Sequence, residues 1–100
     1  MTAINKNPDH VCQQLLAAFF EKYPNDRLKV QADRTLKKLL ACKIPLPGNH
    51  GGWAGGIVYA ISSIGVGVPG ILNSELEEAF NVSMGTVYKR AAMIRKLLGA

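Results

Sequence analysis

Residues 73–98 constrain the fold most, because they read as two short helices joined by a tight turn. Ser74 with Glu77 three residues later matches a capping box at the start of the first helix. Asn81 follows the last apolar residue of that helix, and asparagine tolerates the left-handed conformation in which helices often end. Ser83 can then cap the second helix. These signals predict a helix-turn-helix unit.

The second of these helices has an apolar face and a basic face. Its apolar residues recur at helical spacing: Val87, Ala91, Ile94 and Leu98. From residue 84 to residue 100 the chain has four basic residues and no acid. The second helix of such a unit can enter a DNA groove, so DNA is the first expected partner. We predict that the following residues contact it: Ser83, Thr86, Tyr88, Lys89, Arg90, Arg95 and Lys96.

The start of that helix does not favour base recognition. In sequence-specific helix-turn-helix proteins, the two positions after the cap commonly reach base edges. Here they are Met84 and Gly85, which cannot make the bidentate hydrogen bonds that read a base pair. Tyr88 and Lys89 are suited to phosphate contact, and so is Arg90 if its side chain clears the edge of the core. We therefore expect weak or shape-based DNA binding.

The alternative function is a protein-interaction or scaffold module in which the same helix pair serves only for packing. It predicts an exposed apolar patch, either around residues 66–72 or at Tyr88 and Met93.

The helix predicted at residues 26–42 has a basic face with two possible roles. With residue 43 included, it carries six basic residues and only two acidic ones. This face either contacts phosphates or is simply solvated, and we favour the solvated interpretation.

Residues 52–64 are predicted to form the central core helix. It has no charged residue, and a helix that is apolar nearly all round is buried. Gly55 and Gly56 each cost about 1 kcal/mol relative to alanine inside a helix. Such glycines indicate the close approach of a neighbouring helix, which a side chain would prevent.

Periodicity along the whole chain predicts an all-α protein with five helices. A first helix is expected at residues 7–22, and no segment alternates with the two-residue period of a strand. The 100 residues suffice for a single domain, with residues 1–8 as a loose N-terminal tail. The apolar run at residues 57–72 is shorter than the roughly 20 residues that span a membrane. No apolar signal segment is visible at the N-terminus either, so we expect a cytoplasmic protein with no membrane partner.

Catalytic and metal chemistry is not expected. Cys12 and Cys42 lie among apolar residues in predicted helices, which favours buried free thiols and leaves a disulfide open. His10 and His50 have no further ligand residues at suitable spacing, so neither a metal nor a cofactor is predicted. No acid pair or nucleophile–base set is apparent, so the chain is not expected to be an enzyme.

Two features in order resemble a known family. The segment WAGGIVYA, residues 53–60, precedes the helix-turn-helix, and this order resembles a cyclin-box repeat of the transcription factor IIB type. The resemblance implies a five-helix cyclin-like bundle with the small-residue helix at its centre. It also implies that the last two helices contact promoter DNA, as in transcription regulation. Cyclin-type bundles bind proteins as readily as DNA, so the resemblance does not choose between the two functions.

The sequence is more similar still to a group of uncharacterised bacterial domains. Those domains share a basic leucine-rich helix, a loop with proline and glycine, a Trp-Ala-x-x-Ile-Val-Tyr-Ala helix and a terminal V-S-x-x-T-V segment. The corresponding pieces here are RTLKKLLACKI, PLPGNHGG, WAGGIVYAI and VSMGTVYKRAAMIRKLL. This resemblance covers residues 11–98, and it implies the fold rather than an activity.

Overall fold

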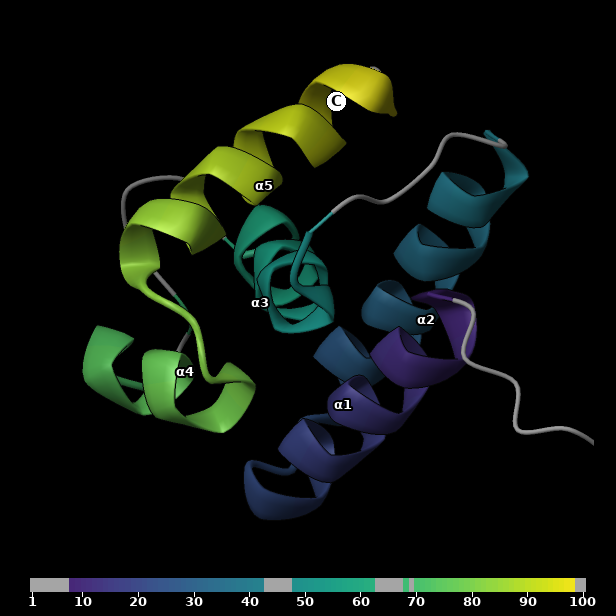
Figure 1. Cartoon of the computed structure of the whole chain (residues 1–100). Coiled ribbons are helices and arrows are strands. Elements are labelled where there is room, and N and C mark those ends of the chain that lie inside the picture. Colours follow the sequence, from purple (N-terminus) through teal and green to yellow (C-terminus); the bar gives the residue numbers. More distant parts are fainter. Residues whose placement is uncertain (1–7, 43–47, 63–67, 69, 99–100) are drawn as a thin grey trace, which may run out of the picture.

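Helices make up the regular structure of residues 8–42, 48–62, 68 and 70–98, the part of the chain that the computed structural model describes. In these ranges five helices follow one another (Figure 1): α1 Pro8–Lys22, α2 Asp26–Ala41, α3 His50–Ala60, α4 Asn73–Phe80 and α5 Met84–Leu97. The described residues contain no strand, so the predicted all-α class with five helices is confirmed. Residues 1–7 of the expected N-terminal tail lie outside the described ranges, and its last residue, Pro8, is instead the first residue of α1.

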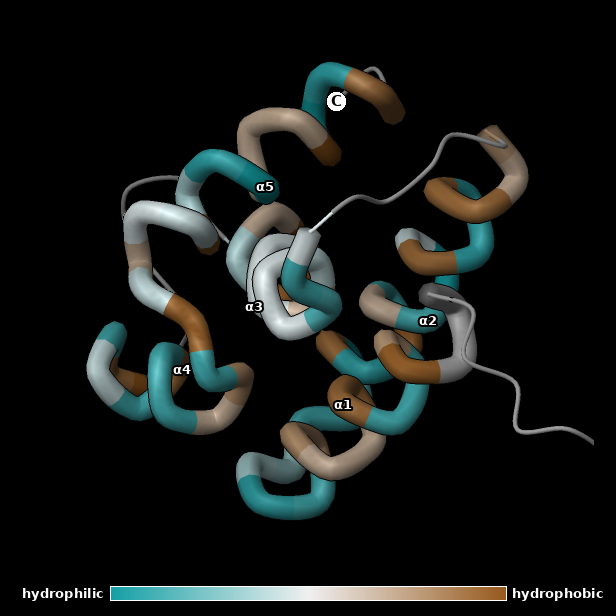
Figure 2. Tube along the Cα trace, in the orientation of Figure 1, coloured by the Kyte–Doolittle hydropathy of each residue, from teal (hydrophilic) through white to brown (hydrophobic). Residues whose placement is uncertain are grey.

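Helix α3 lies at the centre of the molecule, with α1 and α2 on one side and α4 and α5 on the other (Figure 1). Every residue from Gly51 to Val58 is buried. Figure 2 shows α3 as mostly pale, whereas α2 alternates between hydrophilic and hydrophobic residues. An amphipathic helix buries one face, but a helix without a charged face can be enclosed on all sides. The prediction that this segment forms the central core helix is confirmed.

Two glycines allow α5 to lie directly against α3. A Cβ on Gly56 would come within 2.7 Å of the Arg90 Cβ and 3.2 Å of the Ala91 backbone nitrogen. A Cβ on Gly55 would lie 3.3 Å from the Val87 Cγ2 of α5 and 3.3 Å from the Phe80 ring of α4. The close approach inferred from these glycines is therefore confirmed, and the neighbouring helix is chiefly α5.

Helix α3 begins and ends earlier than the predicted range of 52–64. Its N-cap is Asn49, whose side-chain oxygen accepts a hydrogen bond from the Gly51 N–H at 2.7 Å. Asparagine is a preferred N-cap, so the sequence did contain a local signal for this start. At the other end Ile61 is the C-cap, and its N–H still bonds to the Ile57 carbonyl at 3.1 Å. Residues 63 and 64 of the predicted helix lie outside the described ranges.

Helices α1 and α2 follow their predicted ranges closely. Asn25 caps α2, because its side-chain oxygen accepts a hydrogen bond from the Leu28 N–H at 3.1 Å. Phe19 of α1 stacks on Phe80 of α4, with 4.9 Å between the ring centroids. This contact joins the first helix to the C-terminal helix pair across the edge of α3.

The two cysteines lie in different environments. Cys12 is fully buried, whereas Cys42 is exposed. The prediction of a buried thiol is thus confirmed for Cys12 and wrong for Cys42, which follows the last turn of α2 beyond the packed core. Among the described residues, no three His, Cys, Asp or Glu side chains come together in a way that could hold a metal ion. No helix in the described ranges combines the length and the apolar character needed to cross a membrane.

Candidate nucleic-acid interface

Helices α4 and α5 are joined by a three-residue turn, residues 81–83, that local chemistry explains. Asn81 adopts the left-handed conformation, with φ 53° and ψ 49°, and ends α4. Ser83 caps α5, and its hydroxyl accepts a hydrogen bond from the Thr86 N–H at 3.3 Å. Both predictions are confirmed. Each of these helix ends depends on groups that lie within about one turn of each other along the chain. The local sequence is therefore enough to predict it.

The predicted start of α4 is wrong. Leu72, not Ser74, occupies the N-cap position, and the helix begins at Asn73. Glu75 makes the reciprocal contact in place of Glu77, since its side-chain oxygen accepts a hydrogen bond from the Leu72 N–H at 2.9 Å. Ser74 lies within the first turn and is exposed. The N-cap thus lies two residues before the predicted one, and the Glu75 carboxylate satisfies its N–H.

Glu77 contacts α5 and not the start of α4. Its carboxylate accepts a hydrogen bond from the backbone N–H of Met84, the first residue of α5, at 2.6 Å. The negative charge also lies at the positive end of the α5 dipole, where it is stabilising. Glu77 therefore ties α4 to the first turn of α5 across the turn that separates them.

Replacing Glu77 with alanine is expected to lower the free energy of unfolding by about 1–2 kcal/mol, because a charge-assisted hydrogen bond and a favourable helix-end charge are both lost. Urea denaturation measures this change. Glu78→Ala is the matched control, since Glu78 is exposed on the same helix and is expected to change stability by less than about 0.5 kcal/mol. Equal effects of the two substitutions would contradict the assigned role.

Helix α5 presents one face to the core and the other to solvent. Val87, Ala91 and Ile94 are buried, as their spacing predicts, and Leu98 is partly buried. The outer face carries two exposed lysines, Lys89 and Lys96. They are seven residues apart, so they lie on nearly the same side of the helix and about 10 Å apart along its axis.

Arg90 does not lie on that outer face. Its guanidinium carbon lies 4.7 Å from the centroid of the Trp53 ring, a cation–π contact, and the residue is half-buried. The guanidinium extends towards the N-terminal end of α3, where a Cβ on Gly48 would come within 2.7 Å of the Arg90 Nη2. The side chain follows the body of the protein instead of clearing its edge.

Arg95 also folds back onto α3. Its Nη2 donates hydrogen bonds to the Tyr59 carbonyl at 3.3 Å and to the Ala60 carbonyl at 3.4 Å. These carbonyls lie at the C-terminal end of α3, where a positive charge complements the helix dipole. The Tyr59 carbonyl also accepts a hydrogen bond from the Ser62 N–H at 3.2 Å. The structure therefore separates the four bases of α5, with two arginines against α3 and two lysines exposed to solvent.

The remaining predicted residues have local partners. The hydroxyl oxygens of Ser83 and Thr86 lie 3.3 Å apart, so both side chains belong to the cap of α5. Tyr88 is 45% exposed, packs edge-on against Tyr59 with 5.2 Å between ring centroids, and accepts a hydrogen bond from the Asn73 amide at 3.2 Å. Lys89 and Lys96, by contrast, are the two exposed basic residues among the seven predicted contact residues.

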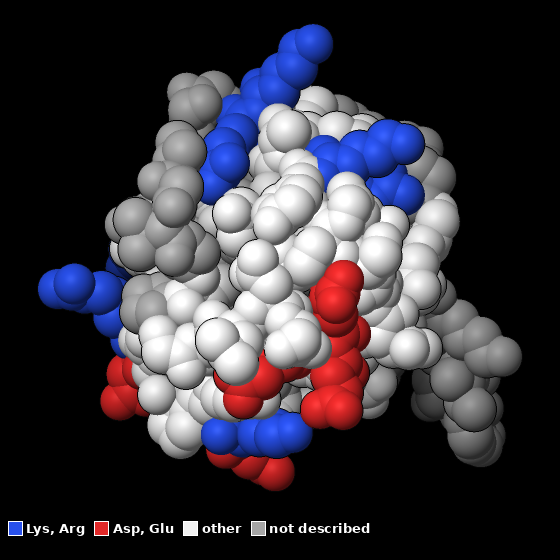
Figure 3. Space-filling model, turned by 90° about the vertical axis from the view of Figure 1, so that its left-hand side faces the viewer, with Lys and Arg blue, Asp and Glu red and all other residues white. Residues whose placement is uncertain are grey.

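Acidic side chains are confined to the lower part of the face in Figure 3. Basic groups lie near the top and at the left of this view, and a basic group also lies among the acidic atoms at the bottom. Helix α4 carries three glutamates, Glu75, Glu77 and Glu78, and no base. A polyanion is therefore repelled by α4 and attracted towards the outer face and C-terminal half of α5.

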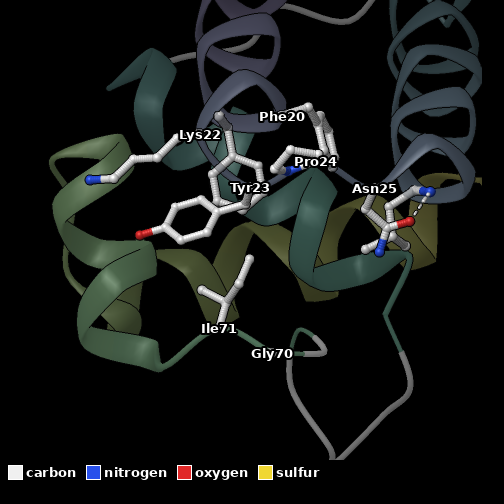
Figure 4. A pocket seen from close by; sticks show the side chains of 9 residues that line it. Phe20, Lys22, Tyr23, Pro24, Asn25, Gly70 and Ile71 are labelled. Atoms are coloured by element: carbon white, nitrogen blue, oxygen red, sulfur yellow. Dashed lines mark hydrogen bonds between the residues drawn. The ribbon is translucent and has the colours of Figure 1, made fainter.

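A hollow of about 290 Å³ lies where the α1–α2 turn meets the segment before α4. Figure 4 shows Tyr23 and Ile71 on either side of it, with Phe20 and Pro24 above them in this view. Among the described residues that line it, Lys22 and Tyr23 are the titratable ones.

Comparison with known proteins adds no family assignment: no family model matches the chain, and no curated protein or solved structure matches it significantly.

Proposed function

We propose that this chain is a small DNA-binding module that holds duplex DNA through phosphate contacts from the outer face of α5. The observation that carries this proposal is the exposed pair Lys89 and Lys96, on a helix with no acid from residue 84 to the end of the chain. The two arginines of α5 add positive potential at the same helix while their guanidinium groups lie against α3. The proposal includes no catalytic step.

The start of α5 supports backbone contact over base recognition. Met84 and Gly85 offer no side-chain hydrogen-bond donors to a groove, and Ser83 and Thr86 are engaged in the cap. Phosphate contacts carry no sequence information, so the binding is expected to depend on salt and only weakly on DNA sequence. The resemblance to cyclin-box repeats of the transcription factor IIB type is in keeping with a role in transcription regulation.

The test is a titration of a labelled random-sequence duplex at several salt concentrations. Removing both lysines with Lys89→Gln and Lys96→Gln is expected to weaken binding on the order of tenfold at low salt. It is also expected to reduce the slope of log K against log salt by about 1.8, because each lost phosphate contact removes about 0.9.

A matched control separates local contact from total charge. Lys22→Gln with Lys29→Gln removes the same charge from two exposed positions, one at the end of α1 and one near the start of α2, and it is expected to leave the slope nearly unchanged. Failure of the unaltered protein to bind duplex DNA even at low salt would overturn the proposal. So would equal losses from the two double variants.

A protein-interaction module is the second candidate, and one observation favours it. Leu72 is 68% exposed and directly precedes Asn73, which is hydrogen-bonded to the exposed Tyr88; Met93 on α5 is also 37% exposed. Residues 66, 67 and 69 of the patch expected at 66–72 lie outside the described ranges. An association that is insensitive to salt and is lost in Leu72→Ser would support this function in place of DNA binding.

A further inference from the structure

We infer that the bound DNA backbone is also held by α2, through Arg34 and Lys38 at the C-terminal end of α3. This inference rests on the proposed function and specifies where the duplex lies. A hollow of about 350 Å³ separates α2 from the last residues of α3. Its lining consists of Gln31, Arg34, Thr35, Lys38, Ala60 and Ile61.

The α2 side of this hollow has the composition of a phosphate-binding surface. All four of its α2 residues carry hydrogen-bond donors, and these are among the side-chain types that most often contact phosphate oxygens. Arg34 and Lys38 are exposed and one helical turn apart, about 6 Å along the axis. The guanidinium of Arg34 suits a bidentate contact, while Lys38 supplies a second charge.

The end of α3 connects this hollow to α5. Ala60 lines the hollow, and its carbonyl oxygen accepts the hydrogen bond from Arg95 of α5. Free carbonyls at a helix C-terminus would ordinarily repel a phosphate. Here Arg95 occupies the carbonyls of both Tyr59 and Ala60, so the helix end between the two basic helices is neutralised. A phosphate backbone can therefore pass from α5 to α2 without meeting an uncompensated negative end.

The distribution of acids supports the same path. From residue 34 to residue 43 the chain has four bases and no acid, as on α5. Figure 1 shows the C-terminal ends of α2 and α5 in the upper part of the molecule, while α4 and the α1–α2 turn lie in the lower part. Glu21 and Asp26 flank that turn, and α4 carries the three glutamates. The duplex is thus placed across the C-terminal ends of α5, α3 and α2, away from α4.

The experiment is the same salt titration, applied to Arg34→Gln with Lys38→Gln. We expect about tenfold weaker binding at low salt and a slope reduced by about 1.8. The single variant Arg34→Lys keeps the charge, and it is therefore expected to retain most of the affinity of the unaltered protein. The double variant Lys22→Gln with Lys29→Gln again serves as the charge-matched control. Unchanged urea midpoints verify that these exposed substitutions leave the fold intact.

The outcomes separate this inference from the proposed function. If the unaltered protein does not bind DNA at low salt, both fail. If Lys89→Gln with Lys96→Gln weakens binding but Arg34→Gln with Lys38→Gln does not, the inference alone fails. It also fails if the α2 variant and the charge-matched control lose affinity equally, because the effect is then one of total charge.

Discussion

Replacing Gly51 with alanine is expected to destabilise the protein by about 3 kcal/mol or more. Gly51 lies in the first turn of α3, and a Cβ there would collide with the backbone carbonyl oxygen of Phe80 at the end of α4. A backbone atom cannot rotate away as a side chain can, so one of the two helix ends must move. Urea denaturation followed by the fluorescence of Trp53, the single tryptophan, measures the loss.

Alanine substitutions at two further glycines provide comparisons for the Gly51→Ala result. Gly56→Ala is expected to destabilise as well, because the new Cβ would meet the Arg90 Cβ at 2.7 Å and a backbone nitrogen of α5. Gly85→Ala is the control, since the nearest atom to its new Cβ is the Ser83 hydroxyl oxygen at 3.8 Å. With that space available, alanine is expected to stabilise α5 by up to about 1 kcal/mol. A Gly51→Ala variant as stable as Gly85→Ala would contradict the α3–α4 contact.

Replacing Trp53 with alanine is expected to cost about 3–5 kcal/mol, the usual range for emptying a large buried aromatic site. The Trp53 side chain is 1% exposed and is the largest of the fully buried side chains. The variant also loses the cation–π contact with Arg90, which contributes on the order of 1 kcal/mol. Because small domains are stable by only about 5–15 kcal/mol, a substantial unfolded population is expected on mild heating.

The measurement for Trp53→Ala is circular dichroism during urea denaturation, since the variant lacks the fluorescent residue. Leu72→Ala is the control, because it shortens an apolar side chain that is 68% exposed. Its expected effect is below about 0.5 kcal/mol. Similar midpoints for the two variants would show that Trp53 does not anchor the core.

The sequence predicts the helices well because the signals for a helix end are local. Asn25, Asn81 and Ser83 each act on backbone groups within a few residues, and the structure confirms the start of α2, the end of α4 and the start of α5. The uncharged stretch around Trp53 likewise predicts burial, because a helix with no polar face cannot lie at the surface. The error at the start of α4 arose because the capping rule favours Ser74 with Glu77 over Leu72 with Glu75, since leucine has no side-chain acceptor. In the structure Glu75 bonds to the Leu72 N–H, while Glu77 bonds to Met84 of α5.

The direction of long side chains depends on partners far along the chain. Lys89, Arg90, Arg95 and Lys96 are equivalent as a basic run on one helix, yet Arg95 binds carbonyls 35 and 36 residues away. Arg90 stacks on Trp53, which is equally remote. Composition and periodicity therefore specify the class, the helices and the buried central segment. The packing of α5 against α3 decides which basic side chains remain exposed to bind a partner. The close approach that the glycines permit brings the two arginines onto α3 and leaves the two lysines exposed to solvent.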